Sequence, residues 1–195
     1  MIMLNRTFAA YWKLDSKGGT IMTRQSTRIL PIVLLMTTCA AGPSYQEFLE
    51  MGRPDPKEWT VGNQGSDQNQ RLVEFVRPGE KIDSWTELFS IQVLKKPDKP
   101  DPIDAFVARA HAGTAKVCPS FVQNVIETQE ASIIYEWKIK KCPPHADQHE
   151  VRKIIYGRIT IYSLAFVEKT AELASEKREK WIKELKSARI IVKGN

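Results

Sequence analysis

Three carboxylates surround one aromatic residue in a short stretch of this sequence. Glu80, Asp83 and Glu87 lie on either side of Trp85. Two carboxylates that flank a substrate can cleave a glycosidic bond, one as general acid and the other as base or nucleophile. The plainer interpretation is a turn glutamate, an exposed aspartate and a charge at the edge of a strand. We favour the plainer interpretation and keep hydrolysis by Glu80 and Glu87 as the alternative.

The histidines suggest metal binding as a second kind of chemistry. His145 and His149 are four residues apart, and on a helix this spacing would place two metal ligands on one face. Pro143-Pro144 directly precedes them, and the remaining histidine is His111. No serine lies in a Gly-x-Ser-x-Gly pattern, and no glycine-rich loop suits a phosphate. We therefore predict a solvated polar loop, no metal, no cofactor and no catalytic residue.

Cys118 and Cys142 are predicted to form a disulfide. Residues 117–128 and 132–142 are rich in Val, Ile and aromatic residues, as strands are. If they form an antiparallel hairpin centred on Glu130, the numbers of opposed residues sum to 260 throughout, and the two cysteines face each other. This register gathers an apolar face and a polar face, so the side-chain pattern and the cysteines select the same pairing. The apolar face would hold Phe121, Val125, Ile133, Tyr135, Trp137 and Ile139, and the polar face Asn124, Thr128, Glu136, Lys138 and Lys140.

The N-terminal region has the layout of a secretory leader. A short basic segment (22–28) precedes an apolar run (29–36) and a group of small residues (37–42), which is the order of a signal peptide. The apolar run is much shorter than the roughly 20 residues that a membrane-spanning helix requires. We therefore predict a signal peptide over 22–41 that starts at Met22, and we interpret residues 1–21 as a mis-annotated N-terminal extension.

Cys39 follows the apolar run, where a bacterial lipoprotein carries its lipidated cysteine. Thr38 and Met36 stand where a small residue and a leucine are usual, so ordinary cleavage after Ala40 or Ala41 is the alternative. Either route exports the chain. The sequence thus predicts a periplasmic or envelope protein, held at the membrane by a lipid anchor if Cys39 is modified.

The distribution of charge argues against nucleic acid as a partner. The whole chain has a formal net charge of +6, but residues 1–41 contain five basic residues and one acidic residue. The remainder, with 24 basic and 22 acidic residues, is close to neutral. A protein that binds a phosphate backbone normally carries many basic residues on one face of its folded domain. The composition of this domain shows no such excess of basic residues.

The hydrophobic pattern predicts one α+β domain over 71–195 after a tether over 42–70. We expect the helix over 101–113 to begin with Asp101 as its N-cap and to end at Gly113. Strands are predicted over 71–77, 85–94, 151–156 and 159–167 besides the hairpin, and helices over 101–113 and 171–188. Trp85, Phe89, Ile91 and Val93 are expected to share one strand face, and Ala174, Trp181, Leu185 and Ala188 the inward side of the last helix. Short links between these elements favour a mainly antiparallel sheet covered by two helices.

The run Pro78-Gly79-Glu80 followed by Trp85-Thr86-Glu87 resembles a motif of a family of uncharacterised bacterial exported proteins, often lipoproteins. The resemblance extends over about 71–189 and includes Cys118, Cys142, Gly157, Tyr162, Phe166 and Trp181. It implies export and brings no catalytic residues. The order of the predicted elements, with an inward tryptophan on the last helix, is also similar to that of the Mog1/PsbP-like α/β/α sandwiches, and fold alone does not fix function.

These observations favour a non-enzymatic docking, binding or structural module whose partner is another cell-envelope protein. The alternative is a periplasmic hydrolase that uses Glu80 and Glu87. An enzyme should bring its carboxylates together in a cleft with perturbed pKa values. A docking module should instead expose apolar side chains on its surface.

Overall fold

The computed structural model describes residues 45–52 and 54–194. The predicted leader, Cys39 and the extension 1–21 lie outside these residues, so the predictions about them are not tested by the structure.

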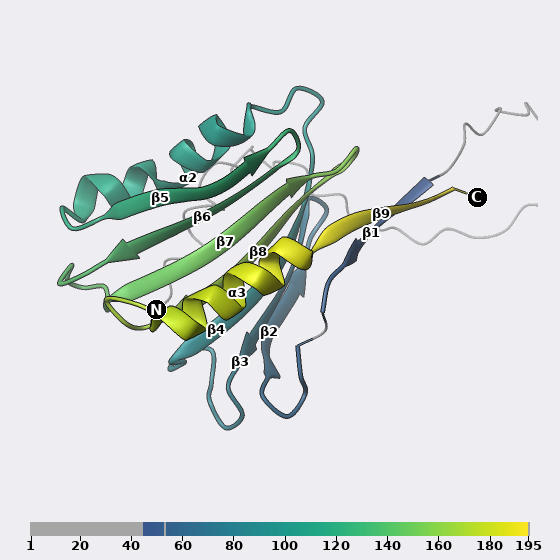
Figure 1. Ribbon diagram of the computed structural model, residues 1–195. Coiled ribbons are helices and arrows are strands. Elements are labelled where there is room, and N and C mark those ends of the chain that lie inside the picture. Colours follow the sequence, from purple (N-terminus) through teal and green to yellow (C-terminus); the bar gives the residue numbers. More distant parts are fainter. Residues whose placement is uncertain (1–44, 53, 195) are drawn as a thin grey trace, which may run out of the picture.

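Seven antiparallel strands form one sheet, and a separate two-stranded ribbon extends from it (Figure 1). The sheet order is β2-β3-β4-β8-β7-β6-β5, and the ribbon pairs β1 with β9. The strands are β1 (Tyr45–Glu50), β2 (Thr60–Ser66), β3 (Gln70–Val76), β4 (Glu87–Lys95), β5 (Val122–Gln129), β6 (Ser132–Ile139), β7 (Gln148–Tyr156), β8 (Thr160–Glu168) and β9 (Arg189–Gly194). The helices are α2 (Ile103–Val117) and α3 (Ser175–Ser187). The structure is therefore α+β with a mainly antiparallel sheet and two covering helices, as predicted.

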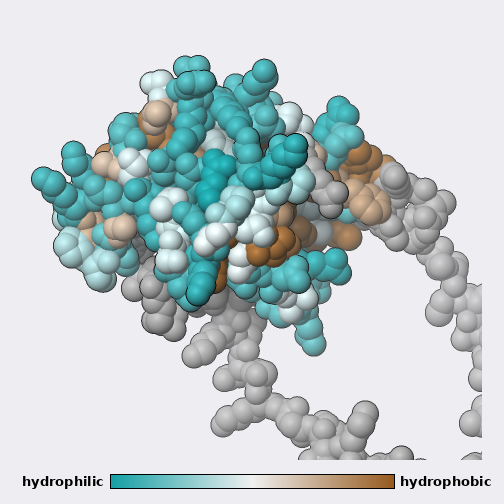
Figure 2. Space-filling view, turned by 90° about the horizontal axis from the view of Figure 1, so that it is seen from below, coloured by the Kyte–Doolittle hydropathy of each residue, from teal (hydrophilic) through white to brown (hydrophobic). Residues whose placement is uncertain are grey.

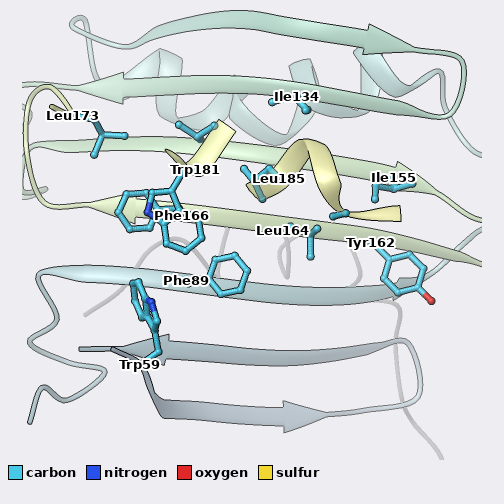
Figure 3. Close-up of a cluster of buried hydrophobic side chains, with 12 residues drawn as sticks. Trp59, Phe89, Ile134, Ile155, Tyr162, Leu164, Phe166, Leu173, Trp181 and Leu185 are labelled. Atoms are coloured by element: carbon cyan, nitrogen blue, oxygen red, sulfur yellow. The ribbon is translucent and has the colours of Figure 1, made fainter. Parts of the chain in front are cut away.

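An aromatic core fills the space between α3 and one face of the sheet. Trp181 of α3 stacks on Phe166 of β8 with ring centroids 4.3 Å apart, and on Phe89 of β4 at 5.1 Å. Trp59, in the loop before β2, meets Trp181 edge-on at 5.8 Å. Figure 3 shows these rings beside Leu164 and Leu185 in one cluster. The inward positions predicted for Trp181, Leu185 and Ala188 are confirmed, whereas Ala174 is exposed because the helix begins only at Ser175.

The opposite face of the sheet packs against α2. Val107 of α2 contacts a second cluster that contains Tyr135, Trp137 and Ile154. Because neighbouring residues of a strand point to opposite faces, β6 is buried almost throughout, with α3 over one side and α2 over the other. The predicted polar face of this strand is therefore not solvated, and Glu136 is 9% exposed.

The disulfide joins the end of α2 to the loop after β6. Cys118 and Cys142 are bonded, with Cα atoms 5.4 Å apart, within the range that a disulfide can bridge. Neither cysteine lies on a hairpin strand as predicted, since β6 ends at Ile139. Helix α2 continues through Gly113 to Val117, and Cys118 is its C-cap residue. Glycine is tolerated inside a helix when the flanking residues are good helix formers, so Gly113 does not end this one.

The predicted hairpin register holds for only half of β5. Val122 to Val125 pair with Lys138 to Tyr135, in the register that sums to 260. A bulge at Ile126 then shifts the pairing by one residue, so that Glu127 lies opposite Ile134. A bulge adds one unpaired residue to a strand, and nothing in the alternating pattern marks its position.

The segment predicted as a tether contributes two strands. β1 pairs with β9 at the other end of the chain, for example Glu50 with Arg189, 139 residues apart. β2 is an edge strand with mostly exposed residues and two glycines. An edge strand with little burial shows almost no alternation of apolar and polar residues, so β2 was not predicted. The pairing of β1 with β9 joins residues far apart in the sequence and leaves no local pattern, so β1 was not predicted either.

Two local predictions about caps and faces were wrong. Asp101 does not cap α2, because the N-cap residue is Pro102 and no side-chain bond is made there; Asp101 forms an ion pair with Arg109 instead. Trp85 precedes β4 and packs with Val76, Leu88 and Val167, on the side opposite Phe89. Because Trp85 lies before the first residue of β4, the alternation of side chains along that strand does not determine which way its side chain points.

Candidate functional site

The motif residues Pro78 to Thr86 build a closed turn between β3 and β4. Gly79 has a φ of +86°, a left-handed conformation that favours glycine. The carboxylate of Glu80 accepts hydrogen bonds from the Thr86 backbone N–H at 3.0 Å and from the Thr86 hydroxyl at 2.5 Å. Trp85 is 1% exposed, and Lys169 lies 4.5 Å from the centre of its ring. The turn residues thus close the loop and bury the tryptophan.

Glu87 connects the motif to α3 through ion pairs. Its carboxylate accepts hydrogen bonds from Arg77 Nε at 2.7 Å and from Lys177 Nζ at 2.7 Å. Lys177 also binds Glu168 of β8 at 2.6 Å, and the Arg77 guanidinium lies 4.2 Å from the centre of the Trp59 ring. This network ties β3, β4 and β8 to the helix.

Neither motif carboxylate has the raised pKa that a general acid needs. Burial raises the pKa of Glu80, but the hydrogen bonds from Thr86 outweigh it and the pKa is lowered. Burial likewise raises the pKa of Glu87, and the bonds from Lys177 and Arg77 bring it below its usual value. Asp83 is exposed. Glu80 and Glu87 are thus bound by neighbouring groups of the fold, which favours a structural role for the motif.

His149 lies on β7, not in the predicted solvated loop, and is 1% exposed. The Leu173 backbone N–H donates to its Nδ1 at 2.9 Å, so the neutral ring carries its proton on Nε2, which faces Glu136 Oε2 at 3.2 Å. Arg178 of α3 binds the same carboxylate through two nitrogens, at 2.6 and 3.0 Å. These bonds fix the segment before α3 to the sheet. Sequence reasoning missed this group because it placed Glu136 in solvent.

A second buried polar group lies on the face covered by α2. Glu150 Oε1 accepts hydrogen bonds from Trp137 Nε1 at 2.8 Å and from Arg152 Nε at 2.6 Å, while its Oε2 makes no hydrogen bond to any described residue. The Tyr135 hydroxyl lies 3.0 Å from His111 Nε2. Burial lowers the pKa of His111 to about 4 and raises the pKa of Tyr135. Both groups are therefore neutral at neutral pH, and the pair contributes no charge to this core.

The three histidines lie in different parts of the fold: His111 on α2, His145 in a loop and His149 on β7. His145 lies in the loop after β6, where its N–H donates to the Cys142 carbonyl at 2.8 Å. Within residues 45–52 and 54–194, no three His, Cys, Asp or Glu side chains are placed to hold a metal ion. In the same residues neither helix has the length and apolar character needed to cross a membrane.

Strand β5 presents the most suitable binding edge of the described structure. It pairs with β6 on one side and ends the seven-stranded sheet on the other. Val122 and Val125 are 43% and 56% exposed. The charged residue of this strand, Glu127, is bound by Lys186 of α3 at 2.7 Å. Edge strands are usually protected by charges or proline, and here the charge is already paired.

The other sheet edge, β2, is less suited to pairing. It contains Gly62 and Gly65 and has its own irregularity between Val61 and Asn63. Glycine is depleted from strands, whereas Val, Ile and Thr, which β5 contains, are enriched. The structure is thus an α+β sandwich in which β5 is the better suited of the two sheet edges for pairing with another strand.

No protein-family profile and no curated protein sequence matches this chain. Among the solved structures that are similar in fold are two of Mog1. One is the Ran-binding protein Mog1p of Saccharomyces cerevisiae, with 12% identity and a TM-score of 0.46 over 76% of this chain and 96% of that chain. The other is a point mutant of Mog1, with 11% identity and a TM-score of 0.46 over 75% and 95% of the two chains. At this level of similarity we base neither a function nor a partner on them.

Proposed function

We propose that this protein is an exported, membrane-tethered docking module that binds an extended segment of another envelope protein along β5. Export and the anchor at Cys39 are supported by the leader pattern of residues 22–41. The observation that carries the docking proposal is the open edge of β5 with its exposed valines.

Strand addition explains why this edge suits a protein partner. The unpaired N–H and C=O groups of an edge strand bind the backbone of an incoming strand, and exposed side chains on alternate positions supply specificity. Val122 lies opposite Lys138 and Val125 opposite Tyr135, so the two valines project from opposite faces of the sheet. A partner strand that pairs with β5 would therefore have an exposed valine beside it on each face of the sheet.

Site-specific photo-crosslinking in cells tests the docking edge. A photoreactive residue at position 122 or 125 should give one discrete adduct with an envelope protein. The same residue at position 61, on the other edge, is the matched control because Val61 is 51% exposed, and it should give no such adduct. Equal adducts from both edges, no adduct from β5, or an adduct between two copies of this chain would each contradict the proposal.

The anchor is tested separately. N-terminal sequencing of the native protein should show that residues 22–38 have been removed, and radioactive fatty acid should label the wild type but not Cys39→Ala. A retained leader would refute export. Equal labelling of both proteins, or labelling of neither, would refute the lipid anchor and leave the docking edge unaffected.

A further inference from the structure

His149 is a titratable side chain in the interior of the molecule. The face seen in Figure 2 is mostly hydrophilic, whereas His149, near the start of β7, is 1% exposed. Its Nδ1 accepts a hydrogen bond from the Leu173 N–H at 2.9 Å, and its Nε2 lies 3.2 Å from Glu136 Oε2. A backbone N–H only donates and a carboxylate only accepts, so this arrangement fits a neutral ring with its proton on Nε2.

A second proton on His149 would break the bond to Leu173. Both ring nitrogens of a protonated histidine are donors, so Nδ1–H and the Leu173 N–H would face each other with their nitrogens 2.9 Å apart. Leu173 is 3% exposed and belongs to the aromatic core (Figure 3), and a buried N–H without an acceptor is costly. The backbone at Leu173 must therefore move when the ring takes up this proton.

The residue before Leu173 offers the protonated ring a new partner. Glu172 Oε1 lies 3.6 Å from His149 Nδ1, just beyond the length of a hydrogen bond. Because Glu172 directly precedes Leu173, a movement that takes the Leu173 N–H away from Nδ1 can bring this carboxylate towards it. Lys138 binds the other oxygen of the carboxylate, Oε2, which leaves Oε1 for the ring.

The charges around the ring come from β6, β8, the segment before α3 and α3 itself. Among the described residues they are the carboxylates of Glu136, Glu168 and Glu172 and the cations of Lys138, Lys177 and Arg178. Each of these cations is bound to one of the carboxylates, so their charges largely cancel. Histidine is the side chain that ordinarily changes its charge between about pH 5 and 8. Acidification is therefore expected to reach this group through His149.

We propose that His149 is a pH-dependent latch that holds residues 169–174 against the sheet. With a neutral ring, the Leu173 N–H is bound to Nδ1 and the segment leads into α3 as described here. With a protonated ring, Leu173 leaves Nδ1, Glu172 takes its place, and the segment loosens together with the first turn of α3. Protonation thus exchanges one hydrogen-bond partner for another at a single nitrogen. This inference rests neither on the docking role of β5 nor on the anchor at Cys39.

Amide hydrogen exchange and histidine NMR of the full chain test the latch as the pH is lowered from about 8. The protection of the Leu173 amide, corrected for the intrinsic exchange rate, should fall about fivefold as the Nδ1 resonance of His149 moves to its protonated position. Fivefold corresponds to the loss of one hydrogen bond worth about 1 kcal/mol. The protection of Val107 and Ala110 in α2 should not change. Constant protection at Leu173, an equal loss in α2, or a ring that stays neutral until the chain unfolds would overturn the proposal.

Variants separate the two partners of the ring. In His149→Asn the amide oxygen takes about the position of Nδ1 and accepts the Leu173 N–H without titrating, so the protection should not depend on pH. His145→Asn is the matched control, because His145 lies in the loop after β6, and it should keep the pH dependence of the wild type.

Glu172→Gln removes the carboxylate that favours the protonated ring, so the loss of protection should move to lower pH. The Glu172 side chain is 62% exposed, and this variant decides the question even if His149→Asn does not fold. An unchanged midpoint in Glu172→Gln, or a pH dependence in His149→Asn equal to that of the wild type, would contradict the latch.

Discussion

Glu87 joins the sequence motif to the last helix, and its charge should matter for stability. Glu87→Gln removes the carboxylate from partly buried ion pairs with Arg77 and Lys177, which we expect to cost about 1 kcal/mol at pH 7. The folded-state pKa of Glu87 lies below its ordinary value of 4.5. Its contribution is therefore present above pH 4.5 and lost as the pH falls through the folded-state pKa.

Urea unfolding of wild type and Glu87→Gln at several pH values measures this effect. The difference between their free energies of unfolding should be largest at neutral pH and shrink in acid. Glu176→Gln is the matched control, because Glu176 is exposed on the same helix and its replacement should change little. A difference that grows in acid would refute the ion-pair account.

Gly79 and Gly113 should respond to alanine with opposite signs. An added Cβ at either position meets no atom within 4 Å, so only the backbone decides. Gly79 has a φ of +86°, where alanine costs about 1–2 kcal/mol. Gly113 lies inside α2, where alanine gains about 0.5–1 kcal/mol. Thermal melts of the two variants would show this, and a stabilised Gly79→Ala would contradict the role given to the turn.

At the scale of residues, the sequence indicated which large side chains are buried but not their polar neighbours. Tyr135 and Trp137 were predicted in the core and are buried there. Glu136 was placed in solvent because a polar residue in an alternating strand usually marks an exposed face, and His149 was placed in a solvated loop after Pro143-Pro144. A second helix covers that face, and its Arg178 compensates the charge. No residue near Glu136 in the sequence indicates that its carboxylate pairs with an arginine 42 positions away.

At the scale of elements, the disulfide should stabilise the fold without being required for it. Cys118 and Cys142 are separated by 24 positions, and closing such a loop is worth about 3 kcal/mol in the chain-entropy model. Replacing both with alanine should therefore lower the melting temperature by roughly 6–12 °C. The circular dichroism spectrum should stay nearly unchanged, since Tyr135 and Trp137 still bury their rings. Reducing agent should lower the melting temperature of the wild type only, and a variant that does not fold would contradict this view.

The elements that the sequence predicted are those with strong local patterns. β3, β4, β7 and β8 lie close to their predicted ranges, and so does α3. The ribbon of β1 and β9 could not be predicted, because its partners come from opposite ends of the chain. The extension of α2 through Gly113 was missed because a glycine is a common but not obligatory stop.

At the scale of the whole molecule, the first and last described strands pair with each other in the ribbon of β1 and β9. Strand β5 lies at one edge of the sheet, where we propose that a protein partner binds. The core between them is tied together by α3 through Trp181, Lys177 and Arg178. This arrangement fits the rigid adaptor that we propose.

The central claim is that a partner strand binds along β5, and backbone hydrogen exchange measures this most directly. The chain would be compared alone and with the envelope protein identified by crosslinking at position 125. Strand addition forms new bonds to the outward amides of β5, so exchange over Val122–Gln129 should slow on binding, while exchange over Thr60–Ser66 on the other edge should not change. Unchanged exchange in β5, or slowing confined to β2, would contradict the account.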